Sequence, residues 1–231
     1  MLRSFAVMLA AATSLAVVIG LLSSWADAQR PTLIPAFRGG VREDAVLKDP
    51  SAIIKISSDC YATAANAKDI SVTARQCIDD HLKRMGASVQ VIAFADYAPV
   101  PAAIEHFTNY RDAAAVFALM RWADGASGWC LIGKSGEAIG MWEPSGAEHD
   151  PKFLAFLKTH PNAALWMPVA ETDAPSVIEF GQGAERFVFP FTIKTCHACA
   201  VIGRARIGFD FDHAGRYDGA NLLSIASADT Q

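Results

Sequence analysis

The sequence predicts an α+β fold in which N-terminal helices are followed by antiparallel β-meanders with an inserted helix. Apolar side chains recur every three or four positions in residues 71–85, which is typical of an amphipathic helix. Phe and Ile occupy every second position in residues 187–193, which is typical of a strand with one buried face. Ser135-Gly136 separates two apolar runs, and such a dipeptide favours a β-hairpin turn.

The helical segment of residues 71–85 carries signals at both ends. Ser71 is expected to cap its N-terminus and Gly86 to end it in a left-handed conformation. The segment 89–95 is ambiguous, because Ser88 could cap a helix there while its β-branched residues also favour a strand.

The central region predicts three strands at 116–122, 129–134 and 137–142. A two-residue turn at 135–136 places Trp129 opposite Trp142, and a symmetric loop places Trp122 beside Trp129. Such a row of indoles is a candidate ligand platform, and the alternative is core packing beneath a helix.

That helix is predicted at 150–160, with Asp150 as its cap and Pro151 in its first turn. A second meander follows, with strands at 187–193, 205–211 and 217–226. Pro190 indicates an edge position or a bulge in the first of these strands.

Composition excludes two classes of protein. Of 231 residues, 52% are hydrophobic and the formal net charge is −4. Intrinsic disorder requires lower hydrophobicity, and an acidic single-domain chain argues against electrostatic binding of nucleic acid. The length is sufficient for a sizeable core.

Residues 1–28 have the pattern of a signal peptide. Arg3 precedes an apolar run, and the run is followed by Ala26-Asp27-Ala28, where small residues fit a signal peptidase. Cleavage after Ala28 would start the mature chain at Gln29, and the alternative is an uncleaved anchor helix. We expect a periplasmic or secreted protein with no stable membrane anchor after cleavage. The mature residues 29–231 are expected to form one α+β domain, with an extended lead-in at 29–50 and an alternative subdivision near 167–177.

Five cysteines lie in the mature chain. Export favours disulfides, and the spacing favours the pairs Cys60–Cys77 and Cys196–Cys199, with Cys130 as a buried thiol in a strand. Other pairings stay open at this stage.

Cys196-His197-Ala198-Cys199 is the motif with the clearest chemistry. A reactive C-x-x-C places its first cysteine at a helix N-terminus, but the residues that follow predict a strand. A structural disulfide is therefore favoured, and the alternatives are a catalytic Cys196–Cys199 pair or a metal held by Cys196, His197 and Cys199. No c-type haem or other cofactor is expected, and no metal site is assigned.

Acidic residues near the C-terminus form a second cluster. Asp210, Asp212 and His213 could bind a hard cation, but Arg204 and Arg206 share that strand face, which favours a charge-balanced surface. The adjacent pairs Glu105-His106 and Glu148-His149 are not self-contained acid–base couples, because neighbours on a strand point to opposite faces.

These observations favour an exported, non-catalytic protein that binds an unidentified protein partner or small ligand in the cell envelope. The alternative is a periplasmic thiol–disulfide oxidoreductase that uses Cys196 and Cys199. A third interpretation is a metal-handling protein.

Overall fold

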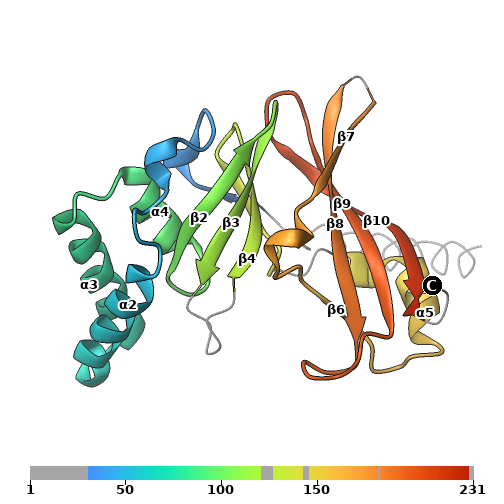
Figure 1. Ribbon diagram of the computed structural model, residues 1–231, viewed down its shortest axis with the longest axis horizontal. Helices are drawn as coiled ribbons and strands as arrows, with labels where there is room; N and C mark the ends of the chain where they lie inside the picture. The colour runs from blue at the N-terminus through green and yellow to red at the C-terminus, as the bar shows by residue number, and fades with distance from the viewer. Residues whose placement is uncertain (1–30, 121–126, 143–145, 182, 229–231) are drawn as a thin grey trace, which may run out of the picture. The chain divides into compact units, whose positions relative to one another are not determined.

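The computed structural model describes residues 31–120, 127–142, 146–181 and 183–228. The predicted signal peptide at 1–28 and Trp122 lie outside these ranges. The α+β prediction is confirmed: helices come first, and two antiparallel sheets and a further helix follow them (Figure 1). The lead-in contains β1 (Thr32–Leu33) and two short 3-10 helices, Pro35–Phe37 and Glu43–Ala45.

The N-terminal helices are α2 (Ala52–Thr63), α3 (Ile70–Arg84) and α4 (Val89–Tyr97). The cap of α3 is Asp69 and not Ser71, because the Asp69 carboxylate accepts a hydrogen bond from the Val72 backbone at 3.0 Å. Gly86 adopts a φ of 72° after α3, as expected for a left-handed C-terminal residue.

The ambiguous segment at 89–95 is helical. The Ser88 hydroxyl accepts from the Val91 backbone, and Val91 and Phe94 are buried. An amphipathic helix can bury these side chains against the neighbouring sheet, and this tertiary packing outweighs their preference for strands.

The first sheet has the order β1-β5-β4-β3-β2. Its remaining strands are β2 (Ala102–Asn109), β3 (Ala113–Met120), β4 (Ser127–Gly133) and β5 (Glu137–Gly140). Along β3, Ala115 and Phe117 belong to one core cluster, whereas Ala114, Val116 and Ala118 belong to another. Both faces of this sheet are therefore buried, which is why its strands are continuously apolar.

The predicted register of the β4–β5 hairpin is wrong by one residue. Cys130 pairs with Gly140 and Leu131 with Ile139, and the Gly136 backbone donates to the Gly133 carbonyl at 2.8 Å. The turn therefore has three residues, and Gly136 takes its left-handed position with a φ of 90°. A shift of one residue moves every side chain of a strand to the other face.

The second sheet has the order β10-β9-β8-β6, and β7 also pairs with β8. Its strands are β6 (Ala164–Trp166), β7 (Ser176–Phe180), β8 (Ala184–Lys194), β9 (Gly203–Phe211) and β10 (Tyr217–Ser227). Pro190 lies between the part of β8 that pairs with β7 and the part that pairs with β6. The expectation of an edge strand or a bulge is therefore wrong, because β8 pairs on both sides and Pro190 pairs in register with Arg206; Pro190 instead occupies the gap between the β7 and β6 pairings, where a residue without an N–H is tolerated.

One core cluster joins the two sheets. It contains alternate residues of β8 and β9 together with side chains of β3, β4 and β5, among them Phe187, Phe189, Ile207, Phe209, Phe117 and Leu131. Helix α5 (Pro151–Leu157) contributes Phe153 to this cluster, and Asp150 caps the helix as predicted. A separate cluster packs α2, α3 and α4 together.

Candidate ligand pocket and disulfide sites

The predicted row of tryptophans is not formed by the described residues. Trp129 lies opposite Met141, is buried in the core between the sheets, and contacts Phe117 with ring centroids 5.0 Å apart. Trp142 packs with the cluster on the other face, where its ring lies 5.8 Å from that of Tyr97. Phe117, not Trp122, takes the position opposite Trp129. The three-residue β4–β5 turn separates Trp129 from Trp142, and the register of the β3–β4 pair places Phe117 opposite Trp129.

A pocket of about 690 Å³ lies beside α5, between this helix, β6 and the end of β5. This volume falls within the range of small-molecule sites, about 300–1,000 Å³. Its walls are mostly apolar and include two indole rings; large lining side chains include Met141, Trp142, Phe153, Trp166, Met167 and Phe191. Trp142 of the predicted row thus lines a pocket, but with Trp166 and not with Trp129.

Two local structures position the pocket walls. Asp150 and Pro151 start α5 so that Phe153 anchors the helix in the core while Leu154 and Leu157 line the pocket. The short strand β6 is held through its pairing with residues 192–194 of β8, which places Trp166 on the opposite wall.

The titratable groups among the described lining residues are Glu148 and His149. They belong to the 3-10 helix Ala147–His149, which follows Gly146 at a φ of 74°. Trp166 also lines the pocket, and its buried Nε1 has no hydrogen-bond partner among the described residues. The pocket therefore combines a large apolar surface with few polar groups, as small-molecule sites commonly do.

The Cys196–Cys199 disulfide lies in the connection between β8 and β9. Cys196 and His197 are exposed, as expected, and residues 195–202 form turns and extended backbone without a helix. The helix N-terminus that would stabilise a reactive thiolate is therefore absent from this connection. The His197 ring contacts that of Trp166 at 5.4 Å, so the disulfide-bearing connection borders the pocket wall.

The second disulfide joins Cys60 of α2 to Cys77 of α3. Both pairs are those that the sequence favoured, and Cys130 is buried outside any disulfide. His81 lies one helical turn after Cys77, and its Nδ1 is 3.8 Å from the Cys60 Sγ and 3.9 Å from the Cys77 Sγ. The sequence analysis missed this histidine, although the i, i+4 spacing of Cys77 and His81 on a predicted helix is a usable signal.

The acidic cluster of residues 210–213 is structural. Asp210 is buried and accepts two hydrogen bonds from Arg186, at 2.5 and 2.7 Å, and one from Asn221. The charge partner is thus Arg186 on the adjacent strand, and not Arg204 or Arg206 as the strand parity suggested.

Asp212 instead closes the β9–β10 turn, where the backbones of Ala214 and Arg216 and the Arg216 guanidinium donate to its carboxylate. Partial burial opposes its ionisation, but these donors outweigh that effect and lower the pKa of Asp212. The carboxylates of Asp210 and Asp212 are therefore both hydrogen-bonded to groups of the protein itself.

Glu105 and His106 do not form an internal couple. Glu105 accepts a hydrogen bond from Ser127, while the His106 ring contacts Phe117 and Trp129 and its Nε2 lies 3.7 Å from Glu171. The two side chains of this pair thus have different partners.

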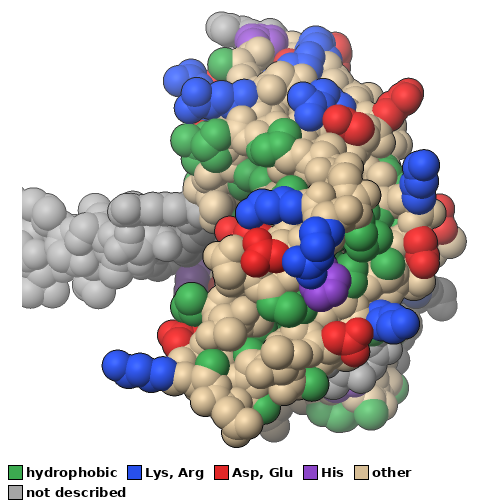
Figure 2. All heavy atoms as spheres, turned by 90° about the vertical axis from the view of Figure 1, so that its left-hand side faces the viewer, with side chains coloured by type: hydrophobic (Ala, Val, Ile, Leu, Met, Phe, Trp, Pro, Cys, Tyr) green, Lys and Arg blue, Asp and Glu red, His purple; other side chains and the backbone are tan. Residues whose placement is uncertain are grey.

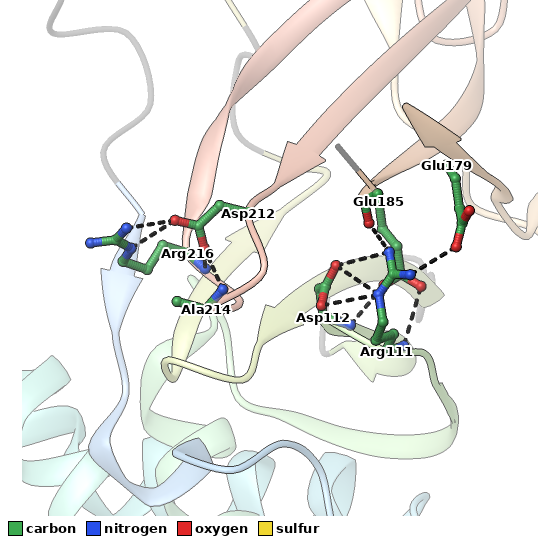
Figure 3. A network of polar contacts seen from close by, with 8 residues as sticks. Arg111, Asp112, Glu179, Glu185, Asp212, Ala214 and Arg216 are labelled. Atoms are coloured by element: carbon green, nitrogen blue, oxygen red, sulfur yellow. Dashed lines mark hydrogen bonds and ion pairs between the residues drawn. The ribbon is translucent and has the colours of Figure 1, made fainter. Parts of the chain in front are cut away.

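A polar network connects the β2–β3 turn to the second sheet (Figure 3). Buried Glu185 accepts from the backbones of Arg111 and Asp112, at 3.2 and 2.7 Å. The Arg111 side chain binds Glu179, the carboxylate directly opposite Glu185 on β7, and also donates to the Gly183 carbonyl. The Arg111 guanidinium offsets the like charges of Glu179 and Glu185, and the Glu185 carboxylate holds the β2–β3 turn in place. We therefore assign the network a structural role.

Within the part of the chain that the structure describes, no helix is both long and apolar enough to cross a membrane. Comparison with protein-family models, curated proteins and solved structures finds no match for this chain.

Proposed function

We propose that this protein is exported to the cell envelope and binds a small, mainly apolar ligand in the pocket beside α5. The observation that carries the proposal is the pocket itself: about 690 Å³ lined by two indoles and several aliphatic side chains. A site of this size and composition can bury most of the surface of a ligand that contains one or two rings. Trp142 and Trp166 favour flat or cyclic groups, because indole faces stack on them.

A binding role fits the polar groups better than catalysis does. Glu148 and His149 line the pocket, but the described lining residues contain no serine or cysteine that they could activate as a nucleophile. Their place in the pocket suits selection of a polar substituent on an otherwise apolar ligand.

Export is supported by the sequence of residues 1–28 and by the two disulfides, which persist in oxidising compartments. Intact-mass measurement of the protein recovered from the envelope fraction tests this part of the proposal. We expect a chain that begins at Gln29, and a full-length species held in the membrane would contradict it.

The binding proposal is tested with 8-anilinonaphthalene-1-sulfonate as the probe and the mature chain as the protein. Ala164 lines the pocket and is exposed, so Ala164→Phe should fill the pocket without disturbing the core. Ala155 is an exposed alanine on α5 that does not line the pocket, and Ala155→Phe is the matched control.

We expect saturable probe binding that weakens at least about tenfold in Ala164→Phe and stays unchanged in Ala155→Phe, because only the first ring removes pocket volume. Equal binding by both variants, at unchanged thermal stability, would place the probe elsewhere and refute the assignment.

The oxidoreductase alternative is favoured by one observation, the exposure of Cys196. Without a helix N-terminus, its thiolate gains no stabilisation from backbone donors. In an insulin-reduction assay with dithiothreitol, we expect wild type and the Cys196→Ser, Cys199→Ser double variant to behave alike. A rate that depends on these cysteines would support the enzyme.

A further inference from the structure

We propose that the Cys60–Cys77 disulfide and His81 form a redox-gated metal site, which holds Zn²⁺ or a metal of similar preference when the disulfide is reduced. The site lies between α2 and α3, away from the pocket residues, and does not depend on the proposed ligand. One Sγ from each cysteine and the imidazole Nδ1 lie within 4.8 Å of one another.

The distances match those of a tetrahedral zinc site. With zinc bonds of about 2.3 Å to sulfur and about 2.0–2.1 Å to nitrogen, the sulfur–nitrogen edge of such a site is about 3.6 Å. The observed edges to the His81 Nδ1 are 3.8 Å and 3.9 Å. The imidazole therefore already stands near its position as a ligand, and the remaining changes are the separation of the two sulfurs and the choice of the imidazole tautomer.

Secondary structure holds the three ligands in place. Cys77 and His81 lie one turn apart on α3, and Cys60 is fully buried on α2, so the ligands come from two packed helices. The His81 Nδ1 also lies 3.2 Å from the Cys77 carbonyl, to which it donates when it carries the ring proton, and this contact holds the ring beside the disulfide before metal binds. For metal binding, Nδ1 must carry the lone pair and Nε2 the proton.

Access is from the side of Cys77 and His81, which are both partly exposed. On the side of the molecule that carries α2 and α3, acidic and basic side chains are interspersed (Figure 2). Among the described residues drawn on that face, the basic side chains are therefore offset by acidic ones, which favours the approach of a dication.

The redox step is balanced by a dithiol reductant. The dithiol supplies two electrons and becomes a disulfide, the bond between the Cys60 and Cys77 sulfurs breaks, and both become thiols. Zinc then displaces the two thiol protons to solvent and binds two thiolates and one imidazole. Three protein ligands leave the fourth tetrahedral position for water. In either redox state the same residues cross-link α2 to α3.

The test uses the mature chain with Cys196→Ser and Cys199→Ser, so that Cys60–Cys77 is the disulfide that remains. A phosphine, which takes up oxygen from water as it reduces the disulfide, avoids a competing thiol. Zinc chloride and cobalt chloride are the probes, with metal content, thiolate-to-cobalt absorption, far-ultraviolet circular dichroism and alkylation of Cys77 as readouts.

We expect one zinc per reduced chain, none in the oxidised chain, cobalt spectra of a tetrahedral thiolate site, and protection of Cys77 from alkylation by zinc. His81→Ala should weaken zinc binding by at least about 10–100-fold, the loss typical of removing even an outer-shell partner. His197→Ala, an exposed histidine outside the site, is the matched control and should leave binding unchanged.

If reduction unfolds α2 and α3, zinc should restore the helical signal, since a ligand that binds only the folded state stabilises it. Zinc uptake that is equal in the oxidised and reduced chains would overturn the proposal. Equal effects of His81→Ala and His197→Ala on zinc binding would also overturn it. If reduction unfolds the helices, a helical signal that does not recover on adding zinc would overturn it as well.

Discussion

At the scale of single residues, buried charges in this protein are matched by specific partners. Asp210 is almost fully buried and is bound by both the Nε and the Nη2 of Arg186. Hydrogen bonding to Asp210 raises the pKa of Arg186 despite the opposing effect of burial. The exposed Arg216–Asp212 pair has similar distances, with 2.7 Å between Nη2 and Oδ2, but lies in solvent. Burial, rather than distance, should therefore separate the energies of the two pairs.

We expect Arg186→Met to lower the free energy of unfolding by about 3 kcal/mol, because it leaves the Asp210 carboxylate buried without its cation. Arg216→Met should cost less than about 1 kcal/mol, as is usual for exposed pairs. Urea denaturation of both variants measures the difference, and equal losses would show that burial does not decide the energy of these pairs.

A second residue-scale effect concerns Asp79 on α3. Burial and the nearby Asp96 carboxylate raise the pKa of Asp79 above its ordinary value, and Lys83 only partly opposes them. A carboxyl whose folded pKa is raised binds its proton more tightly in the folded state, so the wild type loses stability as pH rises through this range. At pH 7 the ionised Asp79 carboxylate therefore lowers the free energy of unfolding.

Asp79→Asn should raise the free energy of unfolding at pH 7 by about 0.5 kcal/mol, a modest value because the site is partly solvated. Below pH of about 3 the wild-type carboxyl is neutral in both states, so the two proteins should converge. Denaturation of both between pH of about 2.5 and 7 checks this. Asp80→Asn is the control: it removes only a lesser contributor to the raised pKa of Asp79 and also alters the carboxylate that Gln76 binds, so it should show a smaller gain.

At the scale of elements, the β4–β5 turn shows how one glycine fixes a register. Gly136 has a φ of 90°, and a Cβ there would lie 2.8 Å from the Ile34 carbonyl oxygen. In the same turn, the Gly136 carbonyl accepts a hydrogen bond from the Ile34 backbone N–H, and this contact brings β1 to the edge of the sheet. The left-handed residue therefore sets both the pairing of β5 and the position of the lead-in.

We expect Gly136→Ala to cost about 2–3 kcal/mol, from the strained φ and from the contact with Ile34. Gly39 has a nearly equal φ of 89°, but a Cβ at that position would meet no atom within 4 Å. Gly39→Ala should therefore lower the free energy of unfolding only through the strain of a side chain at positive φ, by about 1 kcal/mol. Thermal unfolding compares the two, and an equal loss would remove the role assigned to the Ile34 contact.

At the scale of the whole molecule, the two sheets are joined by a shared aromatic core and by a buried carboxylate. Glu185 of β8 accepts from two consecutive backbone groups in the turn between β2 and β3. On the side of the first sheet, the link therefore uses backbone donors, whose positions do not depend on a side-chain rotamer. Figure 3 shows how Arg111 holds Glu179 beside this contact.

Glu185→Gln replaces one acceptor oxygen by a donor that faces a backbone N–H, and we expect a loss of about 1–3 kcal/mol. Glu179→Gln changes the exposed neighbour and should stay within about 0.5 kcal/mol of the wild type. Urea denaturation with probes on both sheets measures the effect. A wild-type stability for Glu185→Gln would show that the aromatic core alone joins the sheets.

The sequence by itself determined the fold class and the long elements, and it favoured both cysteine pairs without excluding other pairings. The helix around residues 71–85, the alternation of aromatic residues along β8 and the helix after Asp150 are local patterns, and local propensity is sufficient to predict them. The sequence analysis missed Asp69 as the cap of α3, because the nearby Ser71 is an equally acceptable cap. It also missed that Gly136 is the third residue of the β4–β5 turn, because Ser135-Gly136 is equally acceptable as a two-residue turn.

Only the tertiary structure decided the candidate sites. The pocket joins α5, β6 and the end of β5, and β6 has three residues, too few to show a period. Trp129 and Trp142 were separated by a one-residue change of register, which the side-chain types did not distinguish. His81 faces the Cys60–Cys77 disulfide because α2 packs against α3. Contacts between distant segments depend on how elements pack, and that information lies in the whole chain rather than in any window of it.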